Sequence, residues 1–370
     1  MGEQYAGVGI LTFHCSDNFG AMLQAYGLKQ FLCRSGVRAS LVPYAPPYMI
    51  GRHWWIPYVP CRKPGGLLTC AAYAASGLQK NFCAYREFSI RRANMRRFRT
   101  EHLVNDGQPV IHFPAGLRDL PYRCYVVGSD QIWNPEITFG LRPEYYGSFA
   151  DKKKARVIAY AASLGGATLP PQYDRDFARL LQNLDAISLR EQEAAGYVKR
   201  FYDGEVTAVL DPVFLLDRES WTEVEKPPAK TGYILTASTE KSPAMTAYVQ
   251  TLSQNTGLPV VQLCTPDDSS GPAEFLGYIH KADYVVTNSF HATAFSIIYE
   301  KNFLAFAHSR LNARIENILQ LHGLEDRLCR DGSVAEIDAP VDWTMVREKS
   351  RAAAAKSVDF LLRHVTGGGL

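Results

Sequence analysis

Short runs of apolar, often β-branched residues alternate along the chain with longer stretches whose apolar residues recur at helical spacing. The short runs predict strands at residues 8–13, 37–44, 124–127, 157–161, 186–189, 233–235, 260–263, 284–287 and 303–306. The longer stretches predict helices at residues 21–33, 81–103, 174–183, 243–254, 272–280, 292–299 and 343–365. Because strand and helix alternate, the chain is predicted to form parallel, doubly wound α/β sheets.

The pattern divides into two series. The chain has 370 residues, enough for two domains of ordinary size. The segment KPPAK at 226–230 is typical of a linker, and a second strand–helix series begins after it. We expect two Rossmann-like domains facing a cleft, at residues 1–205 and 206–370, with the final helix packing back on the first.

An aromatic insertion at residues 45–80 interrupts the first domain. It is rich in Pro, Gly, Tyr and Trp and has no clear periodicity. Its aromatic side chains, Trp54 and Trp55 among them, would either stack on a sugar ring or fill a groove.

Composition narrows the class of protein. Apolar residues make up 46% of the chain and charged residues 21%, as in an ordinary globular protein. The net charge of +3 gives no general case for nucleic-acid binding. The eight cysteines are scattered without a CxxC pair, which argues against a zinc site and fits a reducing compartment. With no signal-peptide pattern and no long apolar run, we expect a cytoplasmic protein.

One stretch of the chain is much more basic than the near-neutral whole. The helix predicted at 81–103 carries many arginines beside a stripe of phenylalanines. Two interpretations stay open: a solvated basic face, or a surface that meets anionic lipid or a lipid-linked acceptor as a peripheral membrane contact.

The segment 283–303 holds the principal candidate site. A β-branched strand at 284–287 is broken by Asn288 and Ser289, which have turn and N-cap chemistry, and a helix follows. Phe290 and His291 therefore lie where a strand ends and a helix begins. The positive end of a helix suits an anion such as phosphate, and an imidazole there can donate to it or move a proton. The alternative is a histidine satisfied by local backbone.

Two polar loops in the first half form further candidate sites. The loop after the first strand contains His14, Asp17 and Asn18, the last of which is also a natural cap or turn residue. The segment GSDQIWNP follows the strand at 124–127. It offers groups for the hydroxyls of an acceptor, unless it is an Asx-turn with a structural tryptophan; its candidates are Ser129, Asp130, Gln131 and Trp133.

Several strings resemble the polysaccharide pyruvyl transferase family in their order and spacing. They extend from Val8 to about Arg327, apart from the aromatic insertion. The strings are FHCSDNFGAMLQAYGLKQFL, VVGSDQIWNP, AYAASLG, ISLREQE, LDPVFLL, ADYVVTNSFHATAFSIIYEKNF and ARIENILQLHGLEDR.

The resemblance implies a fold like that of GT-B glycosyltransferases and transfer of pyruvate from phosphoenolpyruvate to two hydroxyls of a glycan, as in exopolysaccharide, capsule or cell-wall polymer synthesis. The acceptor is a sugar or a lipid-linked glycan. The second domain would hold the donor and the first the acceptor, with no metal or other cofactor required.

The family histidine of the second domain corresponds to His291. In some members the residue two positions earlier is Arg, whereas this chain has Ser289 there. Phe290 adjoins this site, and the charge for the donor would have to come from Arg190, Arg310 or Arg314. Asp130 would orient or deprotonate the acceptor hydroxyl.

Two other functions remain open from the sequence. A GT-B glycosyltransferase would use the helix start at His291 for a nucleotide phosphate. A non-catalytic glycan-binding protein would rely on the aromatic insertion.

Overall fold

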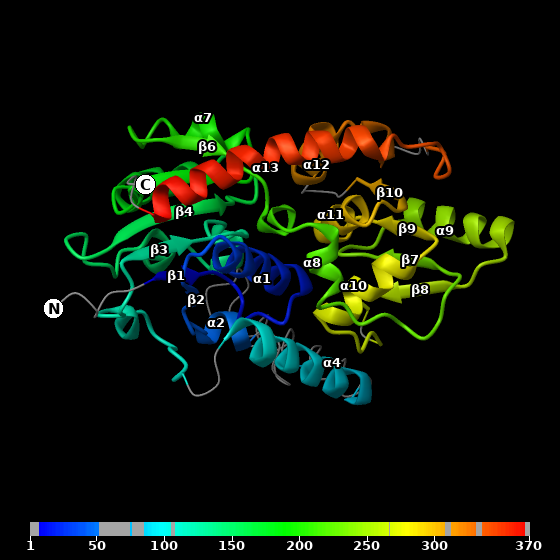
Figure 1. Cartoon of the computed structure of the whole chain (residues 1–370), viewed down its shortest axis with the longest axis horizontal. Coiled ribbons are helices and arrows are strands. Elements are labelled where there is room, and N and C mark those ends of the chain that lie inside the picture. Colours follow the sequence, from blue (N-terminus) through cyan, green and yellow to red (C-terminus); the bar gives the residue numbers. More distant parts are fainter. Residues whose placement is uncertain are drawn as a thin grey trace. The chain divides into compact units, whose positions relative to one another are not determined.

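The computed structural model describes residues 7–51, 75, 85–104, 108–265, 267–307, 312–330 and 335–366 (Figure 1). The tryptophans of the aromatic insertion and Arg310 lie outside the described residues. None of the helices built from the described part of the chain is long and apolar enough to span a membrane.

The first sheet follows the predicted strand pattern. Its strands are all parallel, and among the described residues they run in the order β2-β1-β3-β4-β5-β6. The strands are β1 (Val8–Leu11), β2 (Ala39–Leu41), β3 (Cys124–Val127), β4 (Arg156–Ala162), β5 (Ala186–Leu189) and β6 (Val206–Ala208).

The second sheet is also parallel throughout. In the part of the chain that the structure describes, its order is β11-β10-β9-β7-β8. The strands are β7 (Ile234–Ala237), β8 (Val260–Leu263), β9 (Tyr284–Thr287), β10 (Asn302–Phe306) and β11 (Leu328–Cys329).

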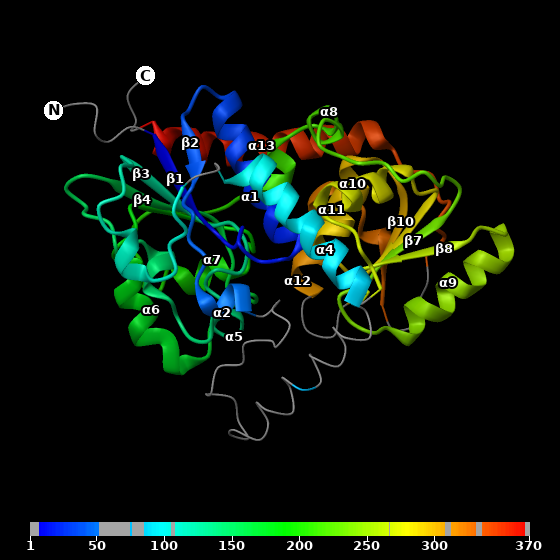
Figure 2. The same ribbon diagram turned by 90° about the horizontal axis from the view of Figure 1, so that it is seen from below.

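Helices connect most of the strands. Figure 2 shows α9 on one face of the second sheet and α10 and α11 on the other, so that this sheet is covered on both faces as parallel sheets require. The helices are α1 (Phe19–Arg34), α2 (Pro47–Ile50), α4 (Tyr85–Phe98), α5 (Pro135–Thr138), α6 (Asp174–Leu181), α7 (Ala194–Val198), α8 (Arg218–Thr222), α9 (Pro243–Thr256), α10 (Pro272–Lys281), α11 (Phe290–Ile298), α12 (Asn312–His322) and α13 (Trp343–Val365).

The prediction of an α/β, Rossmann-like fold is confirmed by these two parallel sheets. Two strands were not predicted, β6 and β11, which are three and two residues long. The helix expected at 81–103 is α4 as far as Phe98, followed by a π-helix, η2, at Arg99–Leu103.

The chain divides into two compact units. Unit 1 comprises Met1–Arg86, Met95–Leu215 and Lys356–Leu370, and unit 2 comprises Glu87–Asn94 and Leu216–Ala355. The boundary expected at residue 205 is corrected, because β6 pairs with β5 and keeps the following residues in unit 1. The end of α13 also belongs to unit 1, where the Ser357 hydroxyl accepts from the Leu210 amide at 2.9 Å.

Each sheet adds strands in both directions from one strand. From β1 the chain first adds β2 on one side and then β3 on the other; from β7 it adds β8 and then β9. In open α/β sheets ligands bind outside the carboxyl ends of the two strands where the direction reverses. The polar residues expected from the sequence follow these strands: His14 follows β1, Asp130 follows β3 and His291 follows β9.

Gly128 ends β3 in a conformation that only glycine adopts readily. Its φ is +118°, and an added Cβ would lie 2.2 Å from the carbonyl oxygen of Tyr160. The strand therefore leaves the sheet in close contact with the backbone of β4.

We predict that Gly128→Ala destabilises the protein by more than about 3 kcal/mol, beyond ordinary overpacking, because the clash is with backbone. Gly140→Ala is the matched control: φ is +101° but the space is open, so only backbone strain of about 1–2 kcal/mol is expected. Urea unfolding of both variants measures the difference. An equal loss of unfolding free energy in the two variants would contradict a backbone clash at Gly128.

Candidate functional site

His14 lies at the carboxyl end of β1 and is buried. Its Nδ1 is 3.3 Å from the carbonyl oxygen of Thr12. A carbonyl only accepts, so Nδ1 carries the hydrogen and Nε2 keeps the lone pair. Burial, and secondly the Arg99 guanidinium, lowers the pKa of His14 to about 4, so the ring is neutral at pH 7.

Arg99, which the sequence analysis missed, holds the loop after β1. Its Nε donates to the His14 carbonyl at 3.2 Å, and its Nη2 pairs with Asp17 at 2.6 Å. The Asp17 carboxylate thus fixes the loop together with Arg99. Asn18 is the N-cap of α1 and accepts from the Ala21 amide at 3.0 Å. Of its two interpretations, a site residue or a cap, the structure shows the cap.

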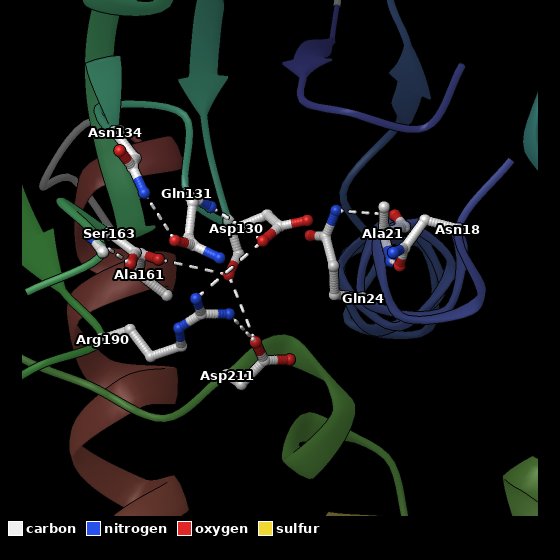
Figure 3. A network of polar contacts seen from close by, with 12 residues as sticks. Asn18, Ala21, Gln24, Asp130, Gln131, Asn134, Ala161, Ser163, Arg190 and Asp211 are labelled. Atoms are coloured by element: carbon white, nitrogen blue, oxygen red, sulfur yellow. Dashed lines mark hydrogen bonds and ion pairs between the residues drawn. The ribbon is translucent and has the colours of Figure 1, made fainter. Parts of the chain in front are cut away.

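A buried ionic cluster surrounds Arg190 at the carboxyl end of β5 (Figure 3). The guanidinium lies 3.0 Å from Asp211, 3.5 Å from Glu191 and 3.9 Å from Asp130. Burial alone would lower the pKa of Arg190, but the carboxylates raise it above its ordinary value.

The donor-binding role expected for Arg190 is therefore corrected. Its side chain is only 3% exposed and belongs to unit 1, where three carboxylates surround it. A guanidinium committed to this cluster balances buried negative charge. Its contact with Asp130 does, however, help to place that carboxylate.

Ser129 and Trp133 are also corrected, because neither can reach an acceptor. The Ser129 side chain is fully buried and donates to the Ala161 carbonyl at 3.2 Å. Trp133 is fully buried, donates to the Tyr145 carbonyl at 2.9 Å and stacks on Tyr146. At these two positions the segment GSDQIWNP therefore has a structural role and does not bind an acceptor.

Asp130 and Gln131 remain at the strand end. Asp130 accepts from the Gln131 amide at 2.8 Å, and its side chain is 14% exposed. The Gln131 side chain, largely buried, accepts from Asn134 at 2.8 Å. Asp130 is thus a partly exposed carboxylate held by its neighbours.

Gln24, a second residue that the sequence analysis missed, faces Asp130 from α1 (Figure 3). Its Nε2 donates to the Thr12 hydroxyl at 2.9 Å and to the Ala21 carbonyl at 2.8 Å. Because the Ala21 carbonyl only accepts, the amide orientation is fixed. No described residue donates to its buried Oε1. An amide oxygen and a carboxylate both accept hydrogen bonds, so this strand end is suited to a hydroxyl that donates.

The other candidate site lies at the carboxyl end of β9 in unit 2. Ser289 is the N-cap of α11, as predicted, and accepts from the Ala292 amide at 3.5 Å. His291 is half-buried in the first turn of α11, with its ring 5.1 Å from that of Phe290. The Arg314 guanidinium lies 5.8 Å from the Phe290 ring. An imidazole and a guanidinium thus both lie near the Phe290 ring.

Asn288 joins the ends of β7 and β9. Its Oδ1 accepts from the Thr239 amide at 2.7 Å, and its Nδ2 donates to the Glu240 carbonyl at 2.9 Å. The loop after β7 is therefore fixed against the segment that carries His291. Within the described residues, no three His, Cys, Asp or Glu side chains come together as ligands for a metal ion.

This combination of parallel sheets and polar strand ends is typical of α/β enzymes that bind small anions and sugars. Residues 18–310 match the family model described as polysaccharide pyruvyl transferase. The match covers more than half of the chain, and the chain belongs to the polysaccharide pyruvyl transferase family. It is therefore a polysaccharide-modifying transferase. A search of curated proteins found no match.

Solved structures with a similar backbone are distant in sequence. An uncharacterised protein from Klebsiella pneumoniae subsp. pneumoniae NTUH-K2044 is 14% identical, with a TM-score of 0.36 over 66% of this chain and 87% of that chain. A UDP-glucosyltransferase from Polygonum tinctorium is 11% identical, with a TM-score of 0.44; the match covers 99% of this chain and 100% of that chain. A UDP-GlcNAc 2-epimerase from Methanocaldococcus jannaschii is 10% identical, with a TM-score of 0.43; the match covers 98% of this chain and 99% of that chain.

We predict that Arg190→Met lowers the free energy of unfolding by about 3–5 kcal/mol, because it leaves buried carboxylates uncompensated. The control Arg179→Met removes an exposed pair with Asp176 and should cost less than about 1 kcal/mol. Denaturant unfolding measures both. A stable Arg190→Met protein with impaired anion binding would instead restore the donor-binding role.

The buried neutral His14 makes stability depend on pH. Its folded pKa of about 4 lies below the ordinary 6.5. Its contribution is therefore fully present above pH 6.5 and is lost as pH falls toward 4, because only the unfolded chain takes up the proton. The full difference is about 3 kcal/mol. His14→Asn keeps an N–H for Thr12 and should show that much less acid sensitivity in urea unfolding; an unchanged pH profile would contradict the neutral, buried ring.

Proposed function

We propose that this protein transfers pyruvate from phosphoenolpyruvate to two hydroxyls of a glycan, forming a ketal. The observation that carries the proposal is the position of His291 in the first turn of α11, next to Phe290, whose ring also lies 5.8 Å from the Arg314 guanidinium, in a chain of this family. Phosphoenolpyruvate is a small molecule with a carboxylate and a phosphate, which suits a helix start and a guanidinium.

The chemistry defines what the residues have to do. Protonation of the methylene carbon makes the adjacent carbon electrophilic, and one sugar hydroxyl attacks it. Phosphate leaves, and the second hydroxyl closes the ring. Two hydroxyl protons are released. One replaces the proton that was added to the methylene carbon, and the other ends on the departing phosphate. The reaction needs a general acid, a base and cationic donors.

On the donor side, His291 acts as the acid or as a donor to the phosphate. Arg314 neutralises the anion, and the Ser289 cap fixes the turn on which His291 lies. Arg310 keeps its expected donor-binding role as part of this proposal. Phosphoenolpyruvate is a substrate here, and no further cofactor enters the scheme.

On the acceptor side, Asp130 is the base that takes a hydroxyl proton. Its partly exposed carboxylate is held by the Gln131 amide and by Arg190. Gln24 faces it from α1, where its Oε1 can accept from the acceptor, and His14 and Asp17 keep their expected acceptor-binding places on the loop after the neighbouring strand β1. The acceptor is a free or lipid-linked glycan that presents two neighbouring hydroxyls.

The test compares phosphoenolpyruvate binding and turnover in His291→Gln and wild type. Since general acid catalysis contributes roughly 10²–10⁴-fold, turnover should fall by about that factor while the thermal unfolding temperature stays within a few degrees. Arg314→Gln should mainly weaken phosphoenolpyruvate binding in calorimetry.

The matched control is His112→Gln, an exposed histidine in unit 1. It should turn over like wild type. Wild-type turnover by His291→Gln would eliminate the assigned role. Stabilisation of the protein by UDP-glucose but not by phosphoenolpyruvate would replace the donor with a nucleotide sugar.

A further inference from the structure

Helix α4 presents a basic face to solvent. At 3.6 residues per turn, Arg86, Ile90, Ala93 and Arg97 lie within about 60° of one another around the axis. All four are exposed. The arginines Arg92 and Arg96 extend this face on one side and are also exposed.

The opposite side of α4 faces the protein. Met95 is fully buried and Phe98 is 3% exposed. Asn94 donates to the Ser269 carbonyl at 2.9 Å, and the half-buried Arg91 donates to the Thr265 carbonyl at 3.4 Å. The packing therefore fixes which face of the helix is turned outward.

This face concentrates the positive charge of the chain. The helix carries five arginines and one glutamate, so its net charge of four exceeds the +3 of the whole sequence. Glu87 lies toward the inner side and is half-buried, and Glu101 follows in η2 beyond the last arginine. The rest of the sequence sums to a net charge of −1 (+3 less +4), so the excess positive charge of the chain lies in this helix, with four of its five arginines exposed.

An apolar side chain lies among these arginines. Ile90 is 41% exposed, and Arg92 lies over the Phe88 ring at 5.7 Å. Between the arginines the face offers Ser89, Ile90 and Ala93, which provide no stacking platform for bases. Arginines around an exposed isoleucine match the boundary of an acidic bilayer, where phosphates meet acyl chains.

We propose that the outward face of α4 docks the protein on a membrane surface containing anionic phospholipid. The arginines contact lipid phosphates and Ile90 enters the headgroup boundary. The contact is peripheral and depends on salt, because it rests on exposed charges. It requires neither donor nor acceptor, so it is tested separately from the transferase activity.

The experiment is co-sedimentation of the full chain with vesicles of phosphatidylcholine, with and without phosphatidylglycerol, at low and high salt. Binding is expected only with phosphatidylglycerol and should weaken with salt. At about fivefold per arginine, the triple variant R86Q/R92Q/R96Q should bind roughly 100-fold more weakly. Ile90→Ser should weaken binding several-fold even where salt has already reduced the charge contribution.

The matched control is K152Q/K153Q/K154Q, which removes the same charge from another exposed segment. Its binding should stay within about threefold of wild type, and thermal unfolding should show that both triple variants are folded. An equal loss of vesicle binding in the two triple variants would show that only net charge matters, and it would overturn the proposal. So would absence of binding to acidic vesicles, or binding to single-stranded RNA in preference to them.

Discussion

The reversal of strand order within each sheet determines where loops diverge at the carboxyl ends of the strands. A parallel sheet that grows in both directions from one strand sends its connections to opposite faces, so the loops at that point diverge. In unit 1 this happens between β1 and β3, and in unit 2 between β7 and β9. The polar side chains to which we assign the transfer follow the strands at these two points. Their positions follow from the order of strands.

Electrostatics then determines what each strand end can do. At the end of β5 a buried guanidinium is surrounded by carboxylates, which makes Arg190 part of the scaffold. At the end of β9 the imidazole of His291 is half-buried at the positive end of a helix of nine residues. The first arrangement neutralises charge within the protein, whereas the second favours an anion from solution.

Local patterns in the sequence were enough to predict most of the fold. Apolar runs and helical spacing predicted all the described strands except β6 and β11 and most of the longer helices, and the cap at Ser289 was predicted because it depends on neighbouring residues. The sequence did not distinguish an accessible polar residue from a buried one at the same strand end, as Ser129 and Trp133 show.

Long-range partners were beyond the reach of sequence patterns. Arg99 and Asp17 are 82 residues apart, and Arg190 and Asp211 meet across paired strands. Neither pair has a local signature. Gln24 is similar, because helical spacing makes it one more residue of α1. The hydrogen bonds to Thr12 and Ala21 fix its amide nitrogen, and Figure 3 shows its side chain directed toward Asp130.

We propose that the end of β9, which is followed by His291, binds phosphoenolpyruvate as the pyruvate donor. The most direct measurement is mass spectrometry of a panel of glycans incubated with the protein and phosphoenolpyruvate, together with assay of released phosphate. We expect a product heavier than the glycan by the mass of one pyruvic acid less one water, with one phosphate released for each ketal formed. Glycans that gain a sugar from a nucleotide donor, with no change in the presence of phosphoenolpyruvate, would contradict it.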